Sequence, residues 1–133
     1  MNDEPHNSRS PYAPGSPETA DEVLRRYAAG ERRFNDSDLD EQNFEGATLA
    51  GAVFDGSWMH SSIFRKCDLR GASFKRCNVK CADFSGADLS GASFQQAAVD
   101  GAEFAGARVE GASFHGAGSY GYTVRDGDGF PIV

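Results

Sequence analysis

The sequence has no long hydrophobic run and no excess of basic residues. No stretch approaches the ~18–20 consecutive apolar residues that cross a bilayer, so we expect no membrane-spanning segment. The chain of 133 residues carries 20 acidic residues against 13 basic ones, which gives a net charge of −7. This balance argues against direct binding to nucleic acid or to an anionic membrane, because both need a basic face. Hydrophobic residues make up only 39% of the chain, so a single domain of this length has few of them with which to build its core.

Cysteine is also scarce, and its number is odd. The three cysteines, Cys67, Cys77 and Cys81, lie in the middle of the chain, a pattern that does not indicate a disulfide framework. Residues 1–5 lack the basic and apolar regions of a secretory signal. We therefore expect a reducing, cytoplasmic location.

A large apolar residue recurs at every fifth position of the central segment. All 17 positions on this spacing between residues 34 and 114 are large and apolar, and nine of the ten phenylalanines lie on it. They are Phe34, Leu39, Phe44, Leu49, Phe54, Met59, Phe64, Leu69, Phe74, Val79, Phe84, Leu89, Phe94, Val99, Phe104, Val109 and Phe114. A period of five fits neither the 3.6 of a helix nor the 2.0 of a strand. It indicates a chain that turns a corner every five residues and points one large side chain inward on each side.

Two further registers of the same period accompany the large one. Two residues before it, from residue 67 onward, the side chains are uniformly small, as at Cys67, Ala72, Cys77 and Ala82. Two residues after it, most positions are glycine, which permits backbone angles that other residues resist. We therefore expect one large and one small inward side chain per side, with glycine at the corners.

These five-residue units resemble the repeats of the pentapeptide-repeat family. The unit Ala-Asp-Leu-Ser-Gly stands at residues 87–91, and Ala-Asp-Phe-Ser-Gly at residues 82–86. The resemblance covers about two-thirds of the chain and implies an all-β solenoid, a right-handed quadrilateral β-helix with 20 residues in each coil. The repeats then make about four coils, and inward residues 20 positions apart should stack in columns, with phenylalanine on phenylalanine.

The chain divides into four segments on this interpretation. Residues 1–15 are rich in proline, serine and asparagine and are predicted to be a disordered tail. Residues 16–30 are predicted to form a capping helix, and residues 31–118 the β-helix. Residues 119–133 would be a C-terminal tail or cap, which could fold over the last coil or pair with a second copy of the chain.

The capping helix has two candidate starting points. One is Ser16 followed by Pro17, and the other is a capping box made by Thr19 and Glu22. The apolar stripe consists of Val23, Leu24 and Tyr27. Gly30 is placed to end the helix, so one short helix over roughly residues 17–29 should cover the first coil.

Residues that could carry out catalysis are poorly represented. His60 and His115 directly follow an inward residue, and neither has a nucleophile or carboxylate spaced as a triad requires. Cys67 and Cys77 fall on the small inward register, where cysteine acts as a compact apolar residue, whereas Cys81 is predicted to be an exposed thiol near a corner. We expect no enzymatic activity, no cofactor and no metal site.

A group of basic residues occupies outward positions on a single coil. Its members on four successive sides are Arg65, Arg70, Lys75 and Lys80. One interpretation is a basic belt that binds an acidic partner. The interpretation that we favour is a ladder of ion pairs between coils, because three acidic residues stand 20 positions from a member of the belt: Glu45, Asp55 and Asp100.

Trp58 departs from the pattern in a different way. It occupies the register just before the large residue, which usually holds Asp, Asn, Ser or Thr and should point outward. Val53 and Ile63 share this register, one repeat to either side. An apolar strip with a tryptophan is typical of a partner-binding site. Alternatively, Trp58 lies flat on the coil beside His60 and binds nothing.

Three functions follow from these features. The first is a non-enzymatic scaffold that binds an unidentified protein, because a rod with flat faces offers a partner little else. The second, from the resemblance, is a DNA mimic that inhibits or protects a type II topoisomerase such as DNA gyrase. The repeats carry 12 acidic and 9 basic residues, a net of only −3, and a basic belt that interrupts the negative surface. The third is self-assembly into a homodimer through the C-terminal coil.

Overall fold

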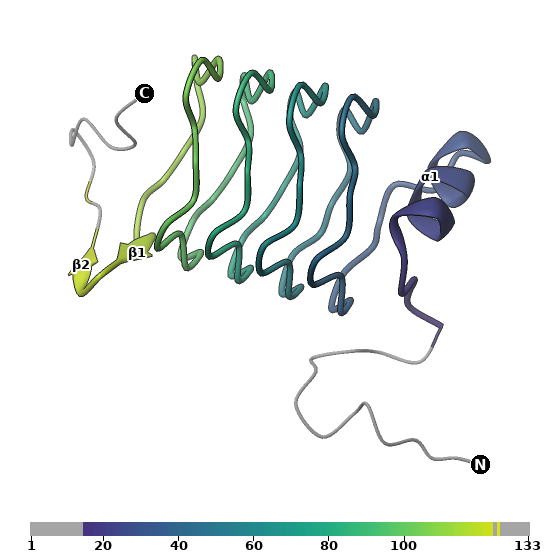
Figure 1. Ribbon diagram of the computed structural model, residues 1–133, viewed down its shortest axis with the longest axis horizontal. Coiled ribbons are helices and arrows are strands. Elements are labelled where there is room, and N and C mark those ends of the chain that lie inside the picture. The colour runs from purple at the N-terminus through teal and green to yellow at the C-terminus, as the bar shows by residue number, and fades with distance from the viewer. Residues whose placement is uncertain (1–14, 124, 126–133) are drawn as a thin grey trace, which may run out of the picture.

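The computed structural model describes residues 15–123 and 125, and it shows a right-handed quadrilateral β-helix (Figure 1). A single short helix, α1 (Ala20–Ala28), lies at the N-terminal end of the stacked coils. Two short strands, β1 (Gly118–Ser119) and β2 (Tyr122–Thr123), lie at the opposite end. The fold that the resemblance implied is therefore confirmed, and so is the short helix at its start.

Each side of a coil pairs in parallel with the side one coil away. The bridges all join residues 20 positions apart, from Arg33 with Val53 at the start to Ala98 with Gly118 at the end. We number the coils 1 to 4 as residues 33–52, 53–72, 73–92 and 93–112. About four coils were predicted, and this number is confirmed.

Every corner is a β-turn that contains one residue in the left-handed conformation. In the turn after Phe44, the amide of Ala47 donates to the Phe44 carbonyl at 2.9 Å, and Gly46 has a φ of 73°. Type II turns require a positive φ at this position, which explains the glycine register. Seven corners between residues 36 and 96 hold another residue type instead, with φ between 55° and 62°.

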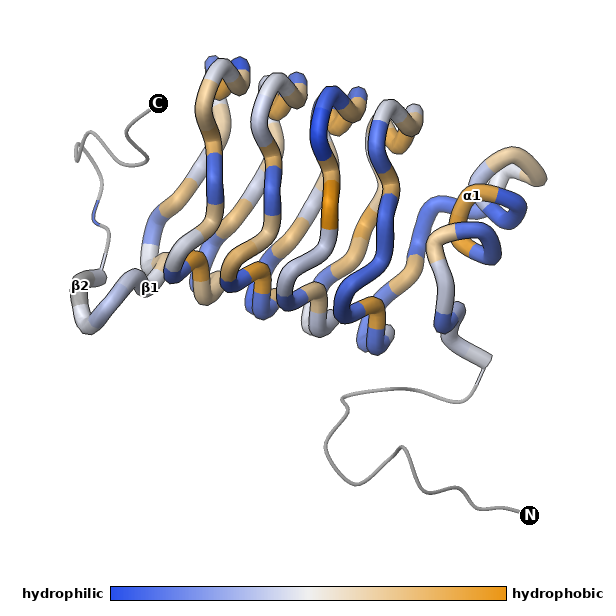
Figure 2. Tube along the Cα trace, in the orientation of Figure 1, coloured by the Kyte–Doolittle hydropathy of each residue, from blue (hydrophilic) through white to orange (hydrophobic). Residues whose placement is uncertain are grey.

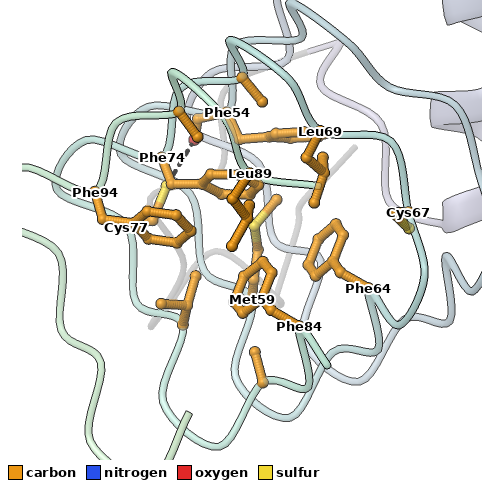
Figure 3. Packing of buried hydrophobic residues seen from close by; sticks show 14 of the residues in the cluster. Phe54, Met59, Phe64, Cys67, Leu69, Phe74, Cys77, Phe84, Leu89 and Phe94 are labelled. Carbon is orange, nitrogen blue, oxygen red and sulfur yellow. Dashed lines mark hydrogen bonds between the residues drawn. The ribbon is translucent and has the colours of Figure 1, made fainter. Parts of the chain in front are cut away.

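The core consists of stacked aromatic rings, as predicted from the inward residues that lie 20 positions apart. Successive phenylalanines of one column, such as Phe54, Phe74 and Phe94, have ring centroids 5.4 and 4.9 Å apart (Figure 3). The second column, which contains Phe64 and Phe84, meets the first edge to face. Hydrophilic and hydrophobic residues alternate along every coil (Figure 2), so the apolar side chains can point inward while the polar ones face out.

Helix α1 starts at the second of the two predicted positions. The N-cap is Thr19, whose hydroxyl accepts the amide of Glu22 at 3.1 Å, so a start at Ser16 and Pro17 is wrong. Both sites offer the same capping chemistry, and the fully buried Val23 favours the register that begins at Thr19. The hydroxyl of Tyr27 donates to the Ala50 carbonyl at 2.7 Å and ties the helix to coil 1. Within the described residues, no helix is long and apolar enough to cross a membrane.

The solenoid ends in an antiparallel hairpin. Gly118 pairs with Thr123 and Ser119 with Tyr122, so the chain leaves the parallel register at this point. Tyr120, at the turn, is 79% exposed. Residues 124 and 126–133 lie outside the described residues, and so do residues 1–14 of the tail predicted to be disordered over residues 1–15. Whether the C-terminal tail caps the last coil or pairs with a second copy therefore stays a prediction.

Candidate partner-binding surface

The centre of each side holds a polar side chain that serves the backbone. In each repeat of coils 2 and 3, three amides bond to neighbouring coils and one closes the turn, which leaves the amide just after the large residue. The polar residue two positions earlier often accepts it: Asn43 Oδ1 bonds the Glu45 amide at 2.9 Å, and Asp83 Oδ1 bonds the Ser85 amide at 2.9 Å. Asp and Asn are suited to this turn because their short side chains reach the amide two residues on. The predominance of these residues at this register therefore has a structural cause.

The side chain of Trp58 has no oxygen that could accept the amide of His60, so a residue of coil 1 accepts this amide instead. The amide of His60 donates instead to Oδ1 of Asp40, at 2.8 Å. Trp58 itself is half-buried, and it pairs through its backbone with Asp38 on one side and Asn78 on the other. The tryptophan thus occupies a position where the fold favours a small polar residue, and Asp40 offsets the lost hydrogen bond.

We call the side that contains this residue the Trp58 wall. Its central residues are Asp38, Trp58, Asn78 and Ala98, and its edges are the corners at residues 55–56 and 60–61 of coil 2 with their equivalents in the other coils. Val53 and Ile63 do not lie on it. Val53 bridges Arg33 and Ser73, and Ile63 bridges Asn43 and Asp83. Because one repeat turns the chain by one side, the two lie on opposite walls, and the three residues do not form the single strip that was proposed.

The predicted basic belt lies at the four corners of one turn of the solenoid, and two of its members are paired. Arg65 contacts Glu45 at 3.4 Å and Asp83 at 3.1 Å. Arg70 holds Asp68 through two hydrogen bonds of 2.8 Å. The favoured interpretation, a ladder between coils, is therefore confirmed for Arg65 and Glu45.

The other two members do not form the expected ion pairs. Asp55 accepts the backbone amide of Lys75 at 3.0 Å, not its ammonium group. Asp100 accepts the amide of Tyr120 at 2.9 Å, and no ion pair joins it to Lys80. Among the described residues, the side chains of Lys75, Lys80 and the neighbouring Arg76 have no ion pair or hydrogen bond. All three lie at the edges of the Trp58 wall in coil 3.

The sequence of the chain matches two models of protein families. One described as "Pentapeptide repeat region" matches residues 57–125, and one described as "Pentapeptide repeats (8 copies)" matches residues 33–65. The chain belongs to the pentapeptide-repeat family. Among curated proteins, none matches the chain significantly.

Several solved pentapeptide-repeat structures resemble the chain. A protein from the thylakoid lumen of Arabidopsis thaliana is 27% identical, with a TM-score of 0.64 over 71% of this chain and 66% of that one. Rfr23 from the cyanobacterium Cyanothece 51142 is 19% identical, with a TM-score of 0.60 over 71% of this chain and 60% of that one. The chain thus matches less than two thirds of the length of either protein. QnrB1, a plasmid-mediated fluoroquinolone resistance protein, is 23% identical over 67% of this chain and 64% of its own, and its TM-score of 0.39 supports no functional inference.

The cysteines fill the inward positions predicted for a pentapeptide-repeat core. The thiols of Cys67 and Cys77 donate to the carbonyls of Phe44 and Phe54 (Figure 3 shows the second bond). Burial raises the pKa of Cys67 to about 11 and that of Cys77 to about 12. Both are therefore protonated at neutral pH, whereas Cys81 is exposed, and all three are free thiols. Within the described part of the chain, no group of three or more His, Cys, Asp or Glu could hold a metal ion.

The structure also adds residues that the sequence analysis left out of the candidate surface. Arg76 shares the Trp58 wall with Lys75 and Lys80, whereas Arg65 and Arg70 lie away from it. Asp36 and Glu41 lie at the two corners of the same wall in coil 1, each with a positive φ. A twenty-residue period applied to the outward positions of a pentapeptide-repeat chain would have grouped these residues, because that period alone defines a wall.

Proposed function

We propose that this pentapeptide-repeat protein is a non-enzymatic interaction scaffold that binds a protein through the Trp58 wall. The observation that carries the proposal is that one wall holds both a half-buried tryptophan and three basic side chains. These basic side chains lack ion-pair partners among the described residues. Elsewhere on the belt, Arg65 and Arg70 are neutralised by carboxylates.

The inward residues are fully used by packing, so recognition falls to the outward positions. Large side chains from Phe34 to Phe94 on the lattice are at most 2% exposed. Tryptophan is enriched among the residues that dominate binding energy at interfaces. Charged groups around such a residue raise the association rate and select the partner. The Trp58 wall combines both elements on one flat surface.

A scaffold without catalysis also agrees with the position of the histidines. His60 in coil 2 and His115 beyond coil 4 are both exposed at corners, and His60 Nδ1 contacts the Ser61 hydroxyl of its own corner at 3.3 Å. A corner on a convex edge does not enclose a substrate. We also propose a cytoplasmic location, which three free cysteines support.

The experiment is a pull-down from a lysate of the source cells, read by mass spectrometry. It compares the wild-type protein with Trp58→Asp and with Ile63→Asp, a matched control in the same coil and register on the neighbouring wall. The proposal expects a partner that the wild type and Ile63→Asp retain and Trp58→Asp loses. Equal losses in both variants, or retention in both, would contradict a site on the Trp58 wall.

A further inference from the structure

The charges of the Trp58 wall are divided between two coils. At its corners, coil 1 carries the acidic residues Asp36 and Glu41, and coil 3 carries the basic residues Lys75, Arg76 and Lys80. Trp58, in coil 2, lies midway between them. Neighbouring coils are ~4.8 Å apart, so the two groups are separated by about 10 Å and cannot pair within one molecule.

Asp36 and Glu41 in coil 1, and the basic group in coil 3, have no ion-pair partner among the described residues. Among the described residues, no ion pair or side-chain hydrogen bond involves Asp36 or Glu41, both exposed in coil 1. The same holds for the basic group in coil 3. Both groups therefore keep their charge available to a second molecule, and they are of opposite sign.

The arrangement is self-complementary under a two-fold axis. An axis that lies in the plane between the two walls, perpendicular to the rod and level with Trp58, exchanges coil 1 with coil 3 and sets each edge of the wall opposite the same edge of the other copy. Asp36 of one copy then faces Lys75 and Arg76 of the other, because all three lie at the same edge and at equal distances from Trp58 along the rod. Glu41 faces Lys80 for the same reason. The two tryptophans meet at the axis, where an isologous interface places a residue against its own copy.

From this complementarity we infer that the partner of the Trp58 wall is a second copy of this chain, packed antiparallel to the first. The inference rests on the proposed function, since it assigns the occupant of the same surface. An acidic protein would use only the basic group in coil 3, whereas a second copy also uses the acidic group in coil 1 at the matching distance. This accounts for both sets of unpaired charges with one interface.

The dimer should be weak and sensitive to salt. Four coils form a face about 20 Å long, and a side of five residues is at most about 17 Å wide. The resulting area of about 340 Å² is smaller than the ~800 Å² per partner of a standard interface. Exposed ion pairs are screened when the Debye length falls to a few ångströms at high ionic strength. We expect reversible association that increases with protein concentration and decreases in concentrated sodium chloride.

The test uses two variants that each carry one sign of charge at these corner positions. Lys75→Glu, Arg76→Glu and Lys80→Glu together make the corners acidic, and Asp36→Lys with Glu41→Lys makes them basic. A lysine fits the left-handed corner positions in coil 1, because Lys66 already occupies one with a φ of 60°. Circular dichroism and thermal unfolding check that both variants fold.

Sedimentation velocity at low salt then measures the dimer. Each variant alone should dimerise on the order of 10- to 100-fold more weakly than the wild type, because attraction becomes repulsion at symmetric contacts. An equal mixture of the two should form a one-to-one heterodimer, since acidic coils then face basic ones throughout. Lys66→Glu, which changes an exposed corner cation off the wall, is the matched control and should dimerise as the wild type does.

Three results would overturn the inference: a wild type that stays monomeric at high concentration, variants that dimerise as it does, or a mixture that stays monomeric. A dimer that survives both charge reversals and disappears from a chain ending at Thr123 would place the interface at the C-terminal end instead. If every sample is monomeric while Trp58→Asp still loses a different captured protein, the self-association fails and the scaffold stands. If Trp58→Asp changes neither the captured proteins nor the oligomeric state, both fail.

Discussion

Replacement of Phe74 by leucine tests how much the ring stacks contribute to stability. Phe74 is fully buried and stacks on Phe54 and Phe94, with centroids at 5.4 and 4.9 Å. It also meets the edges of Phe64 and Phe84, both at 5.6 Å. Leucine keeps an apolar group at this position, so the variant removes ring contacts without introducing a polar atom.

Phe34 provides the matched comparison. It is 1% exposed, and among the described residues its one ring contact is the stack on Phe54 at 5.7 Å. Both substitutions remove the same atoms, which we expect to cost about 1 kcal/mol in lost burial, the typical excess of Phe→Ala over Leu→Ala. Each ring contact is worth about 0.5–1.5 kcal/mol beyond burial. Phe74→Leu loses three more ring contacts than Phe34→Leu. Because leucine keeps some contact with the neighbouring rings, we use the lower part of the range for each contact. The free energy of unfolding of Phe74→Leu should therefore fall by about 1.5–3 kcal/mol more than that of Phe34→Leu.

Urea unfolding followed by circular dichroism measures this difference, and equal slopes for the two variants would confirm that they lose the same cooperative unit. If the two free energies of unfolding differ by less than about 0.5 kcal/mol, the reasoning is refuted, since neighbouring rings would then contribute nothing beyond their burial.

Four further outcomes are expected. Gly71→Ala should destabilise the fold by about 1 kcal/mol in thermal unfolding. Gly71 has a φ of 68° and an added methyl group would meet no atom within 4 Å, so the substitution strains only the backbone angle. An unchanged melting temperature would contradict this expectation. Under native conditions a thiol reagent should modify Cys81 rapidly and Cys67 and Cys77 only on unfolding, because the last two are buried with raised pKa values; three equal rates would show that the core opens readily. The hydrogen bond from the neighbouring guanidinium lowers the pKa of Asp68, so the folded state gains stability above the ordinary carboxyl pKa and loses it as the pH falls below about 4; Asp68→Asn should reduce that slope in acid unfolding curves. Finally, excess protein should leave DNA gyrase supercoiling unchanged, whereas inhibition or protection of the enzyme would favour the DNA-mimic hypothesis.

The core was predictable from the sequence because one rule fixes it. A large residue at every fifth position must point inward wherever the chain turns regularly, so the partners of Phe74 follow from counting. The start of α1 was not fixed in the same way, since Ser16 and Thr19 offer equivalent caps and only the packing of Val23 on the first coil separates them.

The candidate surface was less predictable because its neighbours are set by the coil and not by the repeat. Val53 and Trp58 look adjacent along the sequence, yet they face different directions. Lys75 and Asp55 have opposite charges one coil apart, but the carboxylate accepts a backbone amide that the repeat leaves open, and this competition cannot be read from charge spacing. The outward residues therefore need the three-dimensional register before any of them can be grouped.

The difference between the five-residue inward period and the twenty-residue outward one bears on how such a chain can change over evolution. Deletion of one repeat, for example residues 66–70, would leave every later large residue pointing inward. It would also rotate all later outward residues by a quarter turn, and Lys75 would move to an edge away from Trp58. Gain or loss of single repeats can thus exchange one binding surface for another without any mutation in the core, whereas gain or loss of a whole coil lengthens or shortens the rod and keeps its surfaces aligned.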